Sequence, residues 1–118
     1  MYKVILDTNF LLIPVKFNVD IFKEIERICN FNYELYIIDK TIDELEGKKG
    51  EKLAKNLIKN KRVKVIKANE DGSVDEILKN LKNDKIIVAT NDKALIKDLK
   101  TPIIRLKQGK YLELNNVL

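Results

Sequence analysis

Four acidic residues in this chain stand at the ends of apolar runs or near the starts of helical patterns. Asp7 ends the run in ILDTN, and Asp92 follows the run in IIVATND. Glu44 and Asp75 belong to the helical patterns TIDELE and SVDEIL. If these segments meet, four carboxylates share one crevice, and a divalent cation is needed to offset their mutual repulsion. Carboxylate oxygens suit Mg²⁺ or Mn²⁺, and two such ions can activate a water and stabilise the leaving oxygen in phosphodiester cleavage.

Polar neighbours of these acids are candidates for an outer layer of the same site. Hydroxyl and amide groups beside the acids can hold a bound water or a phosphate oxygen, and a further carboxylate can act as an outer ligand. The candidates are Thr8, Asn9, Thr90, Asn91 and Glu76. Asp98 lies about 120° from Asp92 on a helix, so we expect Asp98 on the surface.

Each acid also has a local explanation that involves no ligand. Asp7 can cap the turn that follows, and Asp75 and Asp92 can each be a favourable charge at a helix N-terminus. Glu44 lies in an acidic helix and can be an ordinary solvated side chain. The metal hypothesis depends on all four acids arriving at one edge of a sheet, because such a convergence is hard to obtain by accident.

The missing residue types narrow the chemistry. The 118 residues include no histidine and one cysteine, Cys29. Ser-His and Cys-His catalysis, imidazole-based zinc sites and intrachain disulfides are therefore excluded. Cys29 falls on the apolar side of a helical pattern, where we expect a buried thiol. A single cysteine suits a reducing cytoplasm, and no apolar run approaches the roughly 18 residues of a membrane span, so we expect a cytoplasmic protein with no membrane partner.

Positive charge is concentrated in two stretches. The net charge is +5, and residues 48–67 contain nine lysines and arginines but one acid, Glu51. A second basic stretch covers residues 93–110. Such stretches fit the phosphate backbone of RNA, although they are equally typical of solvated helix faces. The candidate RNA contacts are Lys48, Lys49, Lys52, Lys55 and Lys93.

The segments that must position these groups alternate between two kinds of pattern. Continuous apolar runs rich in isoleucine and valine predict strands covered on both faces, at residues 2–6, 35–38, 63–66, 86–89 and 102–106. Stripes with a helical period predict helices within residues 21–28, 53–58, 74–81 and 95–99. The alternation indicates an α/β fold with a mostly parallel sheet between two helical layers. The length suits a single domain over residues 1–118.

Turn and capping residues refine these boundaries. The motif GKKG at residues 47–50 predicts that one helix ends and another begins. In the first of these helices we expect Ile42 and Leu45 to contact the core. The motif NEDGS at residues 69–73 predicts a turn whose serine caps the next helix. From Gly109 onward, the tail predicts a short hairpin return.

Taken together, these motifs resemble a PIN domain. The resemblance covers nearly the whole chain, through the segments VILDTNFLL, TIDELE, SVDEIL, VATNDKAL and TPIIRLKQGKYLEL. The last three segments are most similar to the branch associated with ribosomal RNA processing. The similarity to VapC-type toxin nucleases is more distant.

The resemblance implies a definite fold and site. A five-stranded, mostly parallel sheet in the order 3-2-1-4-5 would lie between helices, in a three-layer α/β/α sandwich, with the first and fourth strands side by side. The implied activity is that of a metal-dependent ribonuclease. Its acidic quartet would be Asp7, Glu44, Asp75 and Asp92. Pairing of two copies through helices near the N-terminus is also a family expectation.

Two functions from different classes follow. The first is an endoribonuclease that leaves a 5′-phosphate and a 3′-hydroxyl, with ribosomal RNA precursors among its candidate substrates. The second is a non-catalytic RNA-binding or ribosome-assembly factor whose acids hold a structural cation or none. A phosphotransfer domain with Asp7 as nucleophile is disfavoured, because Asn9 stands where haloacid-dehalogenase-like enzymes carry a second acid.

Overall fold

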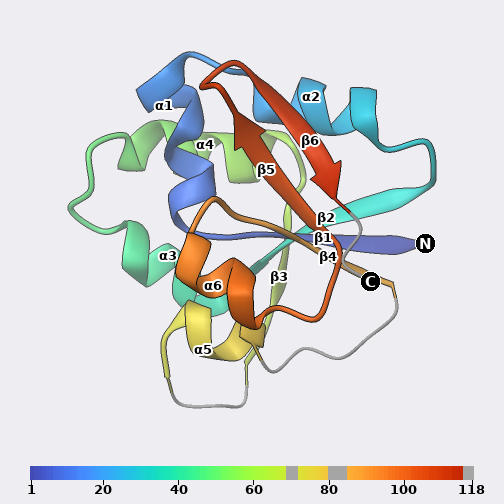
Figure 1. Cartoon of the computed structure of the whole chain (residues 1–118). Helices are drawn as coiled ribbons and strands as arrows, with labels where there is room; N and C mark the ends of the chain where they lie inside the picture. Colours follow the sequence, from blue (N-terminus) through green and yellow to red (C-terminus); the bar gives the residue numbers. More distant parts are fainter. Residues whose placement is uncertain (69–71, 80–84, 116–118) are drawn as a thin grey trace.

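A six-stranded sheet forms the centre of the computed structural model, which describes residues 1–68, 72–79 and 85–115 (Figure 1). The strands are β1 (Tyr2–Leu6), β2 (Tyr33–Ile38), β3 (Lys64–Ile66), β4 (Ile86–Ala89), β5 (Ile103–Lys107) and β6 (Tyr111–Asn115). Their order is β3-β2-β1-β4-β5-β6, so the predicted order 3-2-1-4-5 is confirmed. The first five strands pair in parallel, and the hairpin return adds β6 antiparallel to β5.

Helices cover both faces of this sheet. They are η1 (Asn9–Leu12), α1 (Ile13–Phe17), α2 (Ile21–Ile28), α3 (Asp39–Leu45), α4 (Glu51–Asn60), α5 (Val74–Lys79) and α6 (Lys93–Asp98). Side chains of η1, α1, α2 and α4 join one hydrophobic core, and those of α5 and α6 join a second core. Figure 1 shows the sheet between these two groups, which confirms the predicted three-layer α/β architecture.

The central strand β1 illustrates why its sequence is apolar at successive positions. Val4 and Leu6 belong to the core that includes α2 and α4, whereas Ile5 belongs to the core that includes α5 and α6. All three side chains are completely buried. Because alternate side chains of a strand point to opposite faces, a strand covered on both sides must be apolar throughout.

The connection between α3 and α4 follows the prediction from the GKKG motif. Helix α3 ends at Leu45, and α4 begins at Glu51. Gly50 has a φ of +96°, and a Cβ at this position would lie 2.8 Å from the Val15 side chain. Both the backbone conformation and the close approach of α1 therefore favour glycine at this position.

The start of α5 is capped by the predicted serine. Ser73 Oγ accepts a hydrogen bond from Glu76 N (3.3 Å), which satisfies one of the free N–H groups of the first turn. Residues 69–71 of the predicted turn and residue 81 of the predicted helical stripe lie outside the described residues.

Helices η1 and α1 are absent from the sequence-based predictions. Residues 10–13, which join the two helices, are all buried. A segment with no polar side over a full helical turn carries no 3.6-residue period, so its pattern cannot be distinguished from that of a buried strand or loop.

The expectation that Ile42 contacts the core is wrong. Ile42 is 37% exposed, whereas Thr41 and Leu45 are completely buried. Thr41 and Leu45 are four residues apart and therefore share one face of α3. The buried face of α3 therefore includes Thr41 and Leu45, whereas the apolar residues alone predicted a face with Ile42 and Leu45.

Cys29 is buried after the last turn of α2, as expected, and burial raises the pKa of its thiol to about 11. Over the described residues, the chain has no helix long and apolar enough to cross a membrane.

Two side chains of α2 bind the outer edge of β6. Glu24 Oε1 accepts a hydrogen bond from Leu112 N (3.0 Å), and Arg27 Nη2 donates one to Leu112 O (3.0 Å). Arg27 also pairs with Glu24 (2.9 Å), and this hydrogen bond lowers the pKa of Glu24. Because an edge strand otherwise leaves backbone groups open to another chain, α2 closes this edge at Leu112.

We expect Glu24→Ala to lower the free energy of unfolding by about 1–2 kcal/mol, because the partly buried Leu112 N–H loses its acceptor. Glu24→Gln keeps an acceptor oxygen and is the matched control, for which we expect a smaller loss. Urea denaturation followed by circular dichroism measures both. Equal losses in the two variants would show that the charge of Glu24, and not its bond to Leu112, stabilises this edge.

Candidate functional site

The register between β1 and β4 brings two acidic loops together. Leu6 pairs with Ala89, so the two strands end at the same level. One residue further on, Asp7 N donates a hydrogen bond to Ala89 O (3.0 Å). Asp7 and Thr90 therefore leave the sheet side by side. In open α/β sheets, ligand crevices form at this carboxyl edge of the strands.

Asp7 is a buried carboxylate held by two hydrogen bonds. The residue is only 3% exposed. Its Oδ1 accepts from Thr8 N and its Oδ2 accepts from Thr90 Oγ1, both at 2.8 Å. Burial raises the pKa of Asp7 to about 6, and the charges of Asp75 and Asp92 add to the rise, while the two hydrogen bonds oppose it. The Asp7 carboxylate is thus well fixed but poorly solvated.

Glu44 connects three separate segments at the same edge. Thr8 Oγ1 donates a hydrogen bond to Glu44 Oε1 (2.8 Å), and Val74 N donates to Glu44 Oε2 (3.2 Å). Thr8 also lies 3.5 Å from the hydroxyl of Thr41, on the buried face of α3. Glu44 therefore ties α3 to the end of β1 and to the start of α5.

Asp75 and Asp92 complete the acidic group. Burial raises the pKa of Asp75, and the charges of Asp92 and Glu44 raise it further. Asp92 Oδ1 accepts hydrogen bonds from Ala94 N (3.0 Å) and Leu95 N (3.2 Å), and so caps α6. The structure thus brings all four predicted acids to one edge of the sheet. Asp92 also lies at the N-terminus of α6, as its alternative explanation predicted, and there it caps the helix.

The outer-layer candidates divide into two groups. Thr8 and Thr90 are buried and bond directly to the acids. Asn9 is exposed at the start of η1. The amide of Asn91 is bound away from the acids, because Nδ2 donates to Leu106 O (3.1 Å) and Oδ1 accepts from Leu106 N (2.6 Å). Asn91 therefore joins the loop after β4 to β5, which leaves one N–H and one lone pair of its amide for the outer-layer role predicted for it.

Glu76 lies at the start of α5 and is exposed. The Glu76 carboxylate lies close to Gly72, and a Cβ on residue 72 would collide with Glu76 Oε2. Gly72 has a φ of +128°, a conformation that favours glycine. In this arrangement Glu76 packs against its own turn, so an outer-ligand role would require its side chain to rotate.

The predicted RNA contacts are not equivalent in the structure. Lys48, Lys49, Lys52 and Lys93 are exposed. Lys55 Nζ instead lies 2.8 Å from a carboxylate oxygen of Glu46 and 2.8 Å from one of Glu51. These hydrogen bonds raise the pKa of Lys55 to about 12. The charge of Lys55 is therefore offset within the protein, which makes it a weaker RNA contact than its sequence position suggested.

The four acids are of the ligand type that a hard divalent cation prefers, but their present arrangement does not form a metal site. All are oxygen donors, and among the described residues none of the ion pairs involves them. In their present conformation, no three acidic side chains of the described residues lie so that they could bind one metal ion together. Asp7, Glu44 and Asp92 each direct at least one oxygen at a protein donor. Side-chain rotation would have to accompany metal binding.

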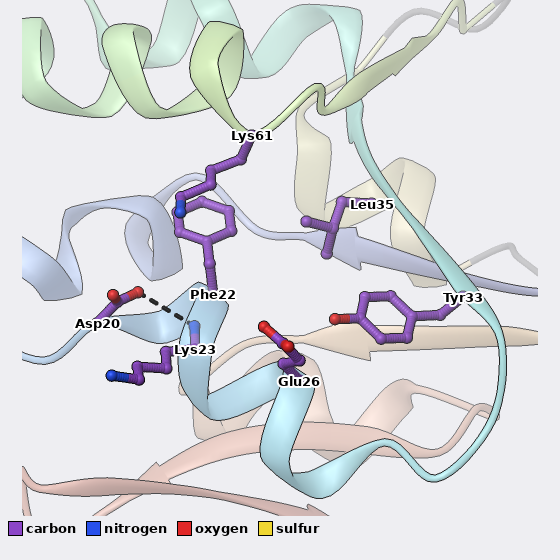
Figure 2. Close-up of a pocket in the computed structure, with 7 residues that line it drawn as sticks. All are labelled: Asp20, Phe22, Lys23, Glu26, Tyr33, Leu35 and Lys61. Carbon is purple, nitrogen blue, oxygen red and sulfur yellow. Dashed lines mark hydrogen bonds between the residues drawn. The ribbon is translucent and has the colours of Figure 1, made fainter.

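A separate pocket lies at the other end of β2. It is formed by α2, the first residues of β2 and Lys61, which follows α4 (Figure 2). Figure 2 shows Lys61 above the ring of Phe22, with Nζ 5.8 Å from the ring centroid. The charged residues that line this pocket are Asp20, Lys23, Glu26 and Lys61. Because the two signs balance, this pocket offers no electrostatic attraction for a polyanion.

Comparison with known proteins places this arrangement among related chains. The profile described as PIN-like domain matches residues 4–109. Ribonuclease VapC4 of Methanocaldococcus jannaschii is 37% identical, and the match covers 97% of each chain. A solved structure of the PIN domain endonuclease Utp24 has a TM-score of 0.83 at 23% identity, over 99% of this chain and 93% of that chain. At that identity the likeness to Utp24 concerns the fold alone.

The raised pKa of Asp7 predicts a specific dependence of stability on pH. The folded protein binds this proton more tightly than the unfolded chain, so the contribution of Asp7 is greatest below about pH 4 and is lost as the pH rises through about 6. In metal-free buffer we expect Asp7→Asn to be more stable than the parent by up to about 3 kcal/mol at about pH 7, and little different at about pH 4.

Urea denaturation at the two pH values measures this difference. Asp98→Asn is the matched control, because Asp98 is a largely exposed acid on α6 that pairs with Lys79 (3.4 Å). We expect it to change stability little at either pH. An advantage of Asp7→Asn that is the same at both pH values would contradict the desolvation of Asp7.

Proposed function

Since the chain belongs to the PIN-like domain family, we propose that it is a ribonuclease that hydrolyses RNA phosphodiester bonds with Mg²⁺ or Mn²⁺. The proposed metal ligands are Asp7, Glu44, Asp75 and Asp92. One observation carries the proposal: acids from four separate segments gather at the carboxyl edge of the sheet and repel one another. A hard cation would offset that repulsion. The ribonuclease name of the Methanocaldococcus jannaschii relative supports RNA as the substrate.

The protein groups around Asp7 keep the proposed ligands at the same edge of the sheet. Thr90 Oγ1 and Thr8 N restrain the two oxygens of Asp7, and Thr8 Oγ1 restrains Glu44. Thr90 Oγ1 also accepts from Asp92 N (3.2 Å), so one hydroxyl positions two acids. A bound divalent cation would supply charge stabilisation for the phosphodiester and lower the pKa of an attacking water. Because Asp7 is buried, its charge acts through a medium that screens it weakly.

Exposed lysines next to this edge suit the RNA backbone. Lys48 and Lys49 lie between α3, which carries Glu44, and α4, while Lys93 directly follows Asp92. Contacts of lysines with phosphates give an affinity that falls with salt and carries little sequence information. The proposed substrate is therefore RNA recognised mainly through its charge at these positions.

A non-catalytic RNA-binding role is the second candidate. It is favoured by the hydrogen bonds that turn the acids toward protein donors instead of toward one another. In that role the same lysines would bind RNA, and the acids would serve to hold β1, α3, α5 and α6 together. The two candidates differ in whether a divalent cation changes what happens to bound RNA.

Two narrower expectations rest on sequence resemblance. One is a role in processing ribosomal RNA precursors, which cleavage assays with a precursor transcript and an unrelated transcript would address. The other is pairing of two copies through helices near the N-terminus, which sedimentation analysis would address. Both concern the context in which the proposed ribonuclease works.

We expect Asp7→Asn to abolish most Mn²⁺-dependent cleavage of RNA, by at least about 100-fold, because a buried metal ligand loses its charge. RNA affinity measured in EDTA should change little, since the lysines are untouched. The measurement follows cleavage of a labelled transcript with Mn²⁺ and with EDTA. Asp98→Asn, the exposed acid on α6, is the control that should cleave like the parent.

Two outcomes would favour the non-catalytic role instead. The first is a parent protein that binds RNA but cleaves none with either Mg²⁺ or Mn²⁺. The second is cleavage that Asp7→Asn retains in full, which would assign the activity to a contaminant or to other residues.

A further inference from the structure

A pocket beside the acidic edge shares Asp92 with it. The pocket has a volume of about 390 Å³ and lies between η1, α1, β5 and the loop after β4. Phe10, Ile13 and Leu106 form part of its lining and are themselves buried, so they give the pocket an apolar floor. We call it the Phe17 pocket, after the aromatic residue on its wall. Apart from Asp92, none of its lining residues is a proposed metal ligand.

Phe17 presents an aromatic ring that is exposed but well positioned. The residue is 49% exposed and ends α1. Asn18 follows it in the left-handed conformation (φ 55°), and Asn18 N donates to Pro14 O (3.1 Å). On another side, a Cβ at Gly109 would lie only 3.2 Å from the Phe17 ring. The turn between β5 and β6, which Figure 1 shows beside α1, therefore packs against the ring.

Polar groups surround this ring and the apolar floor. Asn9 and Asn91, which carry side-chain amides, are among the lining residues, and Lys16 adds a positive charge. Asn91 uses one N–H and one lone pair on Leu106. Each side-chain amide has two N–H bonds and two lone pairs, so one N–H and one lone pair of Asn91 remain for a ligand.

We propose that the Phe17 pocket binds one unpaired nucleobase of the RNA, stacked on Phe17, next to the acidic edge. This inference rests on the proposed function, because it specifies the RNA as single-stranded at that position. The polar edge of the base would meet the amides of Asn9 and Asn91. A phosphate of the same strand would meet Lys16. The pocket thereby adds a base contact to an interface whose other proposed contacts are between lysines and phosphates.

The combination of groups favours a base over an apolar protein side chain. A base has a π-face that stacks on an aromatic ring and a polar edge that needs hydrogen-bonding partners. An apolar side chain in the same place would leave amide groups without partners, which is unfavourable. Bases within a duplex are already stacked and paired, so the pocket selects unpaired RNA.

The test measures binding in EDTA, where the proposed metal chemistry cannot operate. The probes are a short labelled oligouridylate, the same strand carrying an abasic site at each position in turn, and an RNA duplex of equal length. We expect Phe17→Ala to weaken oligouridylate binding by about tenfold, the typical worth of one stacked base. Duplex binding should stay within about twofold, since it depends on phosphate contacts alone.

Two further variants separate stacking from other causes. Phe17→Tyr keeps an aromatic face and should bind the oligouridylate like the parent. Tyr111→Ala removes another exposed aromatic residue, which lies on β6 and is not part of the pocket lining, and should have no effect. One abasic strand should bind the parent about tenfold more weakly and lose nothing more with Phe17→Ala, because both changes remove the same stacking contact.

Equal oligouridylate binding by the parent and Phe17→Ala would overturn the proposal. So would an equal loss on the duplex. If Phe17→Ala leaves RNA binding unchanged but alters the sedimentation of the protein, the pocket belongs to a contact with another copy. If the protein shows no Mn²⁺-dependent cleavage, only the proposed nuclease activity is contradicted, because base binding is measured in EDTA and does not depend on cleavage.

Discussion

The buried carboxylate of Asp7 is the constraint around which this part of the fold is arranged. It follows β1, a strand covered on both faces, and its charge has little water to solvate it. Thr90 and Thr8 N compensate part of that loss, and Thr90 Oγ1 also binds Asp92 N at the start of α6. One poorly solvated group thus determines how β1, β4 and α6 meet, because each must supply a donor or a neighbouring charge.

The remaining acids belong to the same arrangement but do not compensate for the lost solvation of the Asp7 charge. Glu44 bonds to Thr8 and to Val74 N, and the charges of Asp75 and Asp92 raise the pKa of Asp7. Hydrogen bonds from neutral donors hold the carboxylates in place but do not cancel their repulsion. The site is therefore organised by its surroundings and left with excess negative charge, a combination that suits cation binding more than stability.

Sequence predicts the elements where burial leaves a simple pattern. β4 is apolar throughout, β1 is apolar from Val4 to Leu6, and both strands have the predicted bounds. The parallel order places Asp7 beside Thr90. Residues 10–13 are buried without a polar face, so η1 and α1 have no recognisable period. The Leu106 partner of Asn91 and the Glu46 partner of Lys55 could not be predicted, because only the folded backbone brings these residues within reach. The other partner of Lys55, Glu51, lies four residues away on α4, a spacing that does predict an ion pair.

Glu24 and Arg27 make the two borders of the sheet unequal. At β6 they occupy the N–H and C=O groups of Leu112. The opposite border, β3, is only three residues long and exposes Val65. A foreign strand that tried to widen the sheet would find one border obstructed and the other too short to hold it firmly. The fold is thus protected against edge-to-edge aggregation at both sides, by side chains at one and by brevity at the other.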